Sequence, residues 1–428
     1  MKIIKADDKK FKSFFRKLRQ RGGTFSPELL SAVARIIKEV AAKGDIALFK
    51  YTYKFDKYKL TPKTIEVSTK EKEEALAKVS PQDWEILKLA AARIEKYHRH
   101  QINQDWSLKD DEGIELGQRI LPLQRVGIYA PGGKAFYPST LLMAAIPAKI
   151  AGVKGIIIVT PVKDGKINPL VAAAADICGV NRIFKIGGAQ AIAALAYGTK
   201  SIPQVDKIVG PGNAYVAAAK KLVFGQAGID MIAGPSEILI IADKTANASF
   251  AAADMLSQAE HDEMAAAVLF TTSEAFAQKV AKEIDEQMKT LERKKIIKSS
   301  LKNFGAIIIT KDLIHAVELA NDFAPEHLEL MVENPAEILK RVQNAGSVFL
   351  GSYTPEALSD YLAGGNHILP TSGTARFSSP LGVYDFVKRM SVSSFTPEAL
   401  DKLASPTSRF AKLEGLDAHA NSVLVRNK

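Results

Sequence analysis

The chain has 428 residues, of which 47% are hydrophobic and 25% charged; this is typical of a folded protein of about two to four domains and excludes a disordered chain. Its single cysteine, Cys178, excludes a disulfide framework and a cysteine-based zinc cage. The formal net charge of +11 arises in residues 1–100, which hold 24 Lys or Arg and 13 Asp or Glu, whereas residues 101–428 hold 34 of each.

The sequence gives no sign of export or of a membrane segment. It is charged from Lys2 onward and lacks the apolar stretch that a signal peptide needs. Its longest apolar runs, such as residues 155–159, are far shorter than the roughly 20 residues of a membrane span. We therefore expect a cytoplasmic protein with no membrane partner.

Residues 25–100 have a helical pattern. Ser26-Pro27-Glu28 is typical of a helix start with proline in the first turn, and apolar residues follow at helical spacing. A second amphipathic helix is predicted over residues 81–97. It ends in a basic segment, so we expect His98 and His100 to be exposed.

From about residue 120, short β-branched runs alternate with alanine-rich helical runs. This alternation predicts an α/β protein with mostly parallel strands, arranged in two sheets. The predicted strands cover residues 126–129, 156–160, 182–186, 207–209, 238–242, 267–272, 306–310, 328–332, 347–350 and 422–425. A helix start at Pro397 predicts a small separate element at the C-terminus.

Three glycine-rich turns, at residues 129–134, 186–190 and 209–213, each follow a predicted strand and precede a predicted helix. Such turns present backbone N–H groups and a helix N-terminus to a phosphate. None contains G-x-G-x-x-G, and Ala135 stands where a P-loop has Ser or Thr. The turns fit plain strand–helix connections, but three of them together favour a ligand, with a nonstandard dinucleotide site as one possibility.

Two polar clusters offer metal or acid–base chemistry. Gln258 and His261 are three residues apart at a predicted helix end, where they fit either metal ligation or capping of the helix. Glu326 and His327 are adjacent, so their side chains diverge and fit either two proton-transfer tasks around one substrate or an incidental pair. A helix beginning here would lower the pKa of His327.

Two further segments each combine a carboxylate with a histidine, Asp360 with His367 and Glu414 with His419. Without thiolates, a zinc site needs N and O ligands from separate segments, which His261, Asp360 and His419 would supply. Cys178 lies at an apolar helix end and is expected to be buried and inert, which disfavours thiol-dependent aldehyde oxidation.

Taken together, these segments resemble the histidinol dehydrogenase family. The resemblance rests on residues 126–133, 187–194, 210–213, 229–237, 256–262, 324–330, 360–376 and 414–426. It covers nearly the whole chain beyond residue 25, and Ala233-Gly234-Pro235-Ser236-Glu237 is among its most specific motifs. The lysine-rich first 20 residues match no motif of the family.

The resemblance implies the last steps of histidine biosynthesis, in which L-histidinol is oxidised to L-histidine with two NAD⁺ and one water. It implies a bound aldehyde between two hydride transfers, with His327 accepting protons and Glu326 activating the water. It further implies the zinc ligands Gln258, His261, Asp360 and His419. The implied NAD⁺ contacts are Tyr129, Gln190 and Asn213, and the implied substrate contacts are Ser236, Gln258, His261, His327, Asp360, His367, Glu414 and His419.

The family fold resembles that of aldehyde dehydrogenases, with two incomplete Rossmann-like domains and small terminal extensions. We expect a basic extension over residues 1–24, a first domain from residues 25–127 and 237–380, and an NAD-binding domain over residues 128–236. Residues 381–428 are expected to reach the active site of a partner in a homodimer.

Two other functions fit parts of the sequence. A relative acting on another amino alcohol or polyol would use the same metal and NAD⁺ scaffold. A nucleic-acid-binding protein is suggested by the charge of +11 and by aromatic residues among lysines, namely Tyr51, Tyr53, Phe55 and Tyr58. We expect a small-molecule substrate and no nucleic-acid partner.

Overall fold

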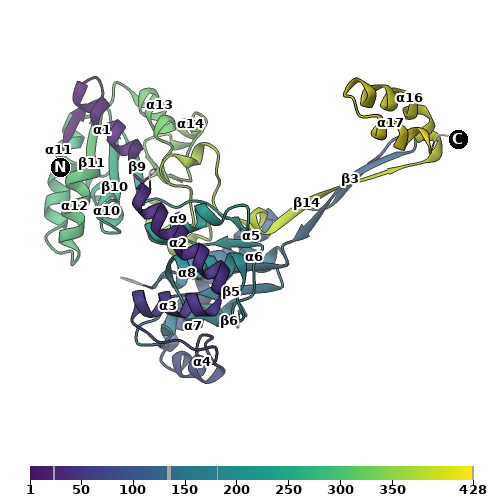
Figure 1. Ribbon diagram of the computed structural model, residues 1–428. Helices are drawn as coiled ribbons and strands as arrows, with labels where there is room; N and C mark the ends of the chain where they lie inside the picture. Colours follow the sequence, from purple (N-terminus) through teal and green to yellow (C-terminus); the bar gives the residue numbers. More distant parts are fainter. Residues whose placement is uncertain (23–24, 133–135, 181, 427–428) are drawn as a thin grey trace.

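The computed structural model describes residues 1–22, 25–132, 136–180 and 182–426. Part of the first glycine-rich turn, residues 133–135, therefore lies outside the described residues. Two parallel sheets form the body, and a thin arm projects from it (Figure 1). The predicted α/β class with parallel sheets is thereby confirmed. Among the described residues, no helix combines the length and apolar character needed to cross a membrane.

The first sheet has five parallel strands in the order β6-β5-β4-β7-β8. This is the Rossmann order without its last strand, and the order reverses between β4 and β7. The strands are β4 (Arg125–Tyr129), β5 (Gly155–Val159), β6 (Arg182–Phe184), β7 (Lys207–Val209) and β8 (Gly228–Ile229). The connecting helices are α6 (Pro138–Ile150), α7 (Pro169–Ile177), α8 (Gly188–Tyr197) and α9 (Ala214–Val223).

The second sheet repeats this order in β11-β10-β9-β12-β13 and adds β1 at one edge. Its strands are β9 (Glu237–Ala242), β10 (Ala266–Thr271), β11 (Gly305–Ile309), β12 (His327–Met331), β13 (Ser347–Leu350) and β1 (Ile3–Lys5). The helices are α10 (Ala248–Ala259), α11 (Glu274–Gln287), α12 (Lys294–Phe304), α13 (Leu313–Phe323) and α14 (Pro335–Leu339). Residues 230–236 lead from the end of β8 to the start of β9, so these two sheet edges lie close together.

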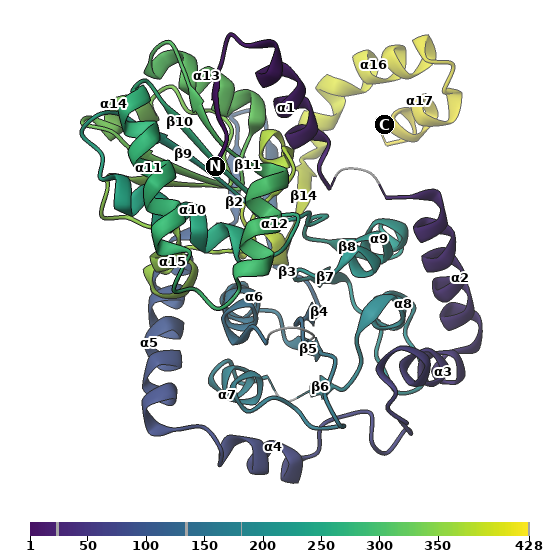
Figure 2. The ribbon, with the colours of Figure 1, turned by 90° about the vertical axis from the view of Figure 1, so that its left-hand side faces the viewer.

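The N-terminal segment belongs to the second sheet. β1 pairs with β11, and helix α1 (Lys9–Gln20) buries Phe11, Phe14, Phe15 and Leu18 against that sheet. In Figure 2 this purple helix lies beside the second sheet, above the first. The basic extension is therefore an integral layer of the fold, with its lysines on the outer face.

Residues 25–100 form four helices around the first sheet: α2 (Pro27–Lys43), α3 (Asp45–Asp56), α4 (Thr69–Leu76) and α5 (Pro81–His98). The apolar face of α2 packs on α8 and α9, and α5 packs on α6. They thus lie with residues 128–236, whereas the expected division placed them with residues 237–380. The expected exposure of His98 was wrong: its ring is buried and its Nδ1 lies 2.8 Å from Ile94 O.

The arm is an antiparallel sheet of β2 (Trp106–Lys109), β3 (Ile114–Pro122) and β14 (Val387–Phe395). Helices α16 (Pro397–Leu413) and α17 (Asp417–Leu424) lie at its tip, far from the body (Figure 1). The helix start at Pro397 is confirmed, but residues 422–425 are not a strand, because α17 packs on α16. The remaining short elements are α15 (Glu356–Leu358), a π-helical turn (Ser359–Ala363) and 3-10 turns at Arg99–Gln101, Thr374–Arg376 and Val383–Phe386.

Candidate active site

The polar cluster lies at the amino-terminal edge of the second sheet. Glu237 begins β9, and His327 begins the neighbouring strand β12. Gln258 lies near the end of α10, and Asp360 lies in the π-helical turn, a conformation often found at functional sites. Segments that are distant in sequence therefore meet at one edge.

His327 is buried and held by the backbone. Its Nδ1 lies 3.2 Å from the carbonyl oxygen of Glu237, which only accepts, so Nδ1 carries the hydrogen. Its Nε2 has no hydrogen-bond partner among the described residues and lies 3.8 Å from Asp360 Oδ1. Burial lowers the pKa of His327 to about 3, so the ring is neutral and Nε2 offers a lone pair. His327 begins a strand, so burial and not a helix N-terminus lowers its pKa.

Glu326 is buried beside His327, and its carboxylate accepts a hydrogen bond from a backbone N–H group. Its Oε2 accepts a hydrogen bond from Glu237 N at 2.9 Å and lies 3.9 Å from His327 Nδ1. Burial, followed by the negative charge of Glu237, raises the pKa of Glu326 well above its ordinary value. A carboxylate with a raised pKa is a stronger base, which suits proton removal from water.

Gln258 is fully buried between His327 and Glu356. In one orientation its Oε1 lies 3.1 Å from His327 Nδ1 and accepts. Turned over, its amide nitrogen donates to Glu356 Oε1 at 3.2 Å and to His327 Nδ1 at 3.1 Å, which requires the hydrogen of the ring to lie on Nε2 instead. Ligand atoms of His327, Glu356 and Asp360 all lie within 4.8 Å of one another. This set shares only Asp360 with the expected zinc ligands.

Two further histidines border the cluster. His367 Nδ1 lies 2.9 Å from Asp360 O, and its Nε2 lies 3.2 Å from Thr140 Oγ1 in α6. His261 follows the end of α10, and its charge would repel those of His327 and His367. Burial lowers the pKa of His367, and desolvation by the surrounding groups lowers that of His261 although its side chain is exposed in this chain; both shifts favour the neutral rings that metals bind. Thr140 also ties the site to the first sheet.

These residues fit a zinc ion by their chemistry. Imidazole nitrogen, carboxylate oxygen and an amide oxygen are hard or borderline donors that suit it, and burial raises the pKa of Asp360 to about 7, as expected of a carboxylate that lacks a positive partner. Glu414 and His419 do not join this cluster within one chain. They are exposed at the tip of the arm, at the end of α16 and in α17.

The expected NAD⁺ contacts lie at the carboxyl edge of the first sheet, where its order reverses. Tyr129 ends β4, and its Oη accepts from Gly188 N at 3.1 Å. Gln190 is buried in α8 with its Oε1 unpartnered among the described residues, and Asn213 caps α9. A Cβ on Gly210 would lie 2.3 Å from Tyr129 O, so only glycine allows this close approach. The helix N-termini and the free amide oxygen fit a dinucleotide.

Several charged residues of the site were not among the candidates named from the sequence. They are Arg21, Glu237, Glu356, Glu329 and Asp254. Glu329 Oε1 accepts from Glu356 N at 2.9 Å, and burial raises the pKa of Glu329 well above its ordinary value. Only Glu356 was within reach of sequence reasoning, because it lies four residues before Asp360.

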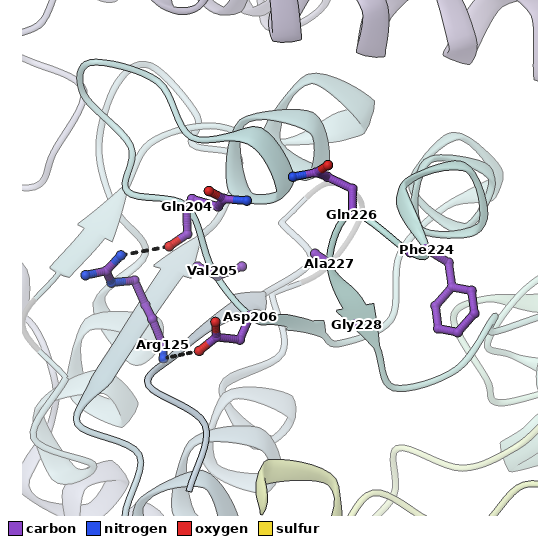
Figure 3. Close-up of a pocket in the computed structure, with 9 residues that line it drawn as sticks. Arg125, Gln204, Val205, Asp206, Phe224, Gln226, Ala227 and Gly228 are labelled. Carbon is purple, nitrogen blue, oxygen red and sulfur yellow. Dashed lines mark hydrogen bonds between the residues drawn. The ribbon is translucent and has the colours of Figure 1, made fainter. Parts of the chain in front are cut away.

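A separate surface pocket of about 560 Å³ opens at the amino-terminal edge of the first sheet, between Arg125, Asp206 and Phe224 (Figure 3). The Arg125 guanidinium donates there to Gln204 O at 2.8 Å. None of the expected site residues lines it. It lies at the opposite edge from Tyr129 and has no part in the candidate site.

Comparison with known proteins gives a consistent result. The family model described as histidinol dehydrogenase matches residues 19–427. Histidinol dehydrogenase of Syntrophotalea carbinolica is 52% identical over 100% of this chain and 99% of its own length, and that of Aquifex aeolicus is 52% identical over 99% and 98%. The crystal structure of histidinol dehydrogenase from Elizabethkingia anophelis superimposes with a TM-score of 0.93 at 38% identity, covering 100% of this chain and 98% of that one. The chain therefore belongs to the histidinol dehydrogenase family, whose members are oxidoreductases of histidine biosynthesis.

Proposed function

We propose that this chain oxidises L-histidinol to L-histidine in two successive hydride transfers to NAD⁺, with zinc as the substrate anchor. The observation that carries the proposal is the pair of buried groups at the start of β12. His327 is neutral with its Nε2 free, and Glu326 has a raised pKa. The first suits removal of an alcohol proton and the second suits activation of a water.

The proposed zinc ligands are Gln258, His261 and Asp360, with His419 supplied by another chain. When bound, zinc supplies a positive centre for the amino and imidazole groups of histidinol, and NAD⁺ supplies the hydride acceptor. Tyr129, Gln190 and Asn213 would border the cofactor. We also propose that the reaction takes place in the cytoplasm.

The chain's own residues then divide the proton transfers. In the first oxidation, His327 Nε2 accepts the hydroxyl proton as the hydride leaves carbon. Glu326 next takes a proton from the water that attacks the aldehyde, and the water oxygen becomes the second oxygen of the carboxylate. In the second oxidation, His327 Nε2 again accepts a hydroxyl proton. Between steps, both groups release their protons to solvent.

The decisive experiment measures NADH formed from L-histidinol by zinc-loaded and by metal-stripped protein. We expect two NADH per histidinol and one histidine, with a severe loss of substrate binding after stripping. Glu326→Ala should slow aldehyde oxidation by about 10²–10⁴-fold while leaving substrate binding intact. Unchanged turnover of Glu326→Ala, or full activity of stripped His261→Ala, would contradict the assignments.

We further propose a homodimer in which the arm of one chain completes the site of the other. Support comes from the arm itself, which exposes large apolar side chains such as Trp106 (55%) and Phe410 (65%), and from helix α17, which contains His419 and lies at the tip of the arm, far from the body (Figure 1). Mixing unfolded Glu326→Ala and His419→Ala chains and refolding them together should restore activity, because a mixed dimer has one intact site. If the mixture stays as inactive as either variant alone, the shared site is wrong.

A further inference from the structure

The buried guanidinium of Arg21 lies next to the proposed catalytic pair, although it belongs to the N-terminal segment. Its side chain is fully buried, and among the described residues its Nη2 makes all of its hydrogen bonds. Nη2 donates to Pro235 O at 3.0 Å, to Ser236 O at 3.3 Å and to Glu237 Oε2 at 2.6 Å. One nitrogen therefore holds three consecutive residues of the turn that enters β9.

The turn at residues 235–237 also holds Glu326 in place. Glu237 N donates to Glu326 Oε2, and the Glu237 side chain is fixed at both ends, by Arg21 and by Ser372 N at 3.0 Å from Oε1. Ser236, an expected substrate contact, lies within the same turn. A shift of this turn would therefore move both the hydrogen-bond donor of Glu326 and the substrate side of the site.

The N-terminal segment is well anchored to act as a support. Helix α1 ends at Gln20 after burying four apolar side chains in the core of the second sheet, and the Arg21 guanidinium also lies over the Phe304 ring at 5.6 Å. Gly22 follows directly with a φ of +75°, and a Cβ there would lie only 2.5 Å from Pro235 Cδ. Arg21 and Gly22, which are adjacent in sequence, therefore both contact the turn at residues 235–237.

We propose that Arg21 is a positioning residue for the second oxidation: it fixes residues 235–237 so that the Glu237 amide holds Glu326 in place to activate the water. The inference rests on the proposed function, which gives Glu326 that task. Arg21 does not touch the reacting atoms. His327, which serves the first oxidation, has a second support outside residues 235–237, because its Nδ1 lies 3.1 Å from Gln258 Oε1 as well as 3.2 Å from Glu237 O.

The test compares the two oxidations within each variant. The rate of aldehyde oxidation divided by the rate of alcohol oxidation, both at saturating substrate, does not depend on how much protein is folded. Arg21→Met should lower this ratio by about 10–100-fold, the range expected of a small misplacement of a reacting group. Arg21→Lys should restore part of it, and free aldehyde trapped with semicarbazide should rise in Arg21→Met.

Arg19→Met is the matched control, because Arg19 ends the same helix but pairs with Asp322 at 2.9 Å on the surface. It should leave the ratio unchanged. If Arg21→Met does not fold, Gly22→Ala replaces it, since its methyl group pushes Pro235 while the charge pair is kept, and the same fall is expected. A wild-type ratio in the folded variant would overturn the inference.

Glu326→Ala separates this inference from the proposed function. If Glu326→Ala leaves the ratio unchanged, the assignment of Glu326 fails, and the role of Arg21 fails with it. If Glu326→Ala lowers the ratio and the Arg21 and Gly22 variants do not, only the positioning role is refuted.

Discussion

Lys220→Met should destabilise the protein and weaken NAD⁺ binding, because a buried ion pair holds the third glycine-rich turn. Lys220 and Asp230 are only 2% and 1% exposed and bond to each other. Lys220 Nζ also donates to Gly210 O at 2.9 Å, while Asp230 Oδ2 accepts from Gly210 N at 2.7 Å. The pair thus holds both backbone groups of Gly210, next to the proposed cofactor contact Asn213.

The structure sets the size of the effect. Removing one partner of a buried pair costs about 3–5 kcal/mol, and Asp230 keeps two backbone donors, from Gly210 and Met231, so the lower end applies. A chain of 428 residues unfolding as one unit has an entropy of about 0.9 kcal/mol/K, so a loss of about 3 kcal/mol lowers Tm by about 3 °C. The KM for NAD⁺ should rise more than kcat falls, because the turn contributes to binding throughout the reaction.

Thermal unfolding, monitored by circular dichroism, measures the change in Tm. Initial rates over a titration with NAD⁺ measure the change in KM. Lys221→Met is the control, since this neighbouring lysine is exposed, and it should change neither value. The double variant Lys220→Met with Asp230→Asn should regain stability, because no charge is left buried without a partner. A Lys220→Met protein with the Tm and the KM of the wild type would refute the reasoning.

Three further predictions follow from buried groups and from the proposed metal. Burial raises the pKa of the Cys178 thiol to about 12, so Cys178→Ser should keep both oxidations at wild-type rates, and loss of aldehyde oxidation alone would point to a thiol intermediate. Burial raises the pKa of Asp254 from 3.8 to about 6, so the stabilising contribution of this group is present below about pH 4 and is lost as the pH rises through 6. Relative to Asp254→Asn, the wild type should lose about 2–3 kcal/mol of unfolding free energy between pH 4 and pH 8. Denaturant titrations that give a constant difference between the two proteins would contradict this. Zinc at about a hundred times its Kd should raise the unfolding free energy by about 2.7 kcal/mol, so an unchanged Tm after chelation would argue against a site at Gln258 and His261.

The sheets were predictable because their strands are buried on both faces and read as short apolar runs. The predicted strand at residues 207–209 agrees with β7, and the others of the body agree within a few residues. The arm strands β2, β3 and β14 were missed because they are largely exposed and lack an apolar run. Residues 422–425 are β-branched in part, but packing of α17 on α16 decides their conformation.

The site was predictable only where the residues match a family motif. Glu326 and His327 are adjacent in sequence, yet their separate surroundings follow from β9 pairing with β12, which places Glu237 against both. Arg21 gave no local signal. Its role depends on a contact with Glu237, 216 residues away, which spacing along the chain does not encode.

The candidate site is acidic although the chain as a whole has a net charge of +11. The +11 lies on the surface of the N-terminal part, but the site itself is acidic: Glu237, Glu326, Glu329 and Glu356 are all buried, and Arg21 is buried beside them. Burial raises the pKa of these carboxyl groups, and the charge of Arg21 offsets this only in part at Glu237 and Glu326, so the site holds protons until a further cation replaces them. Zinc and the ammonium group of histidinol are both cations. The acidic interior therefore favours the proposed metal and substrate, whereas the lysines of the first 20 residues lie on the surface and Arg21 is buried against Glu237.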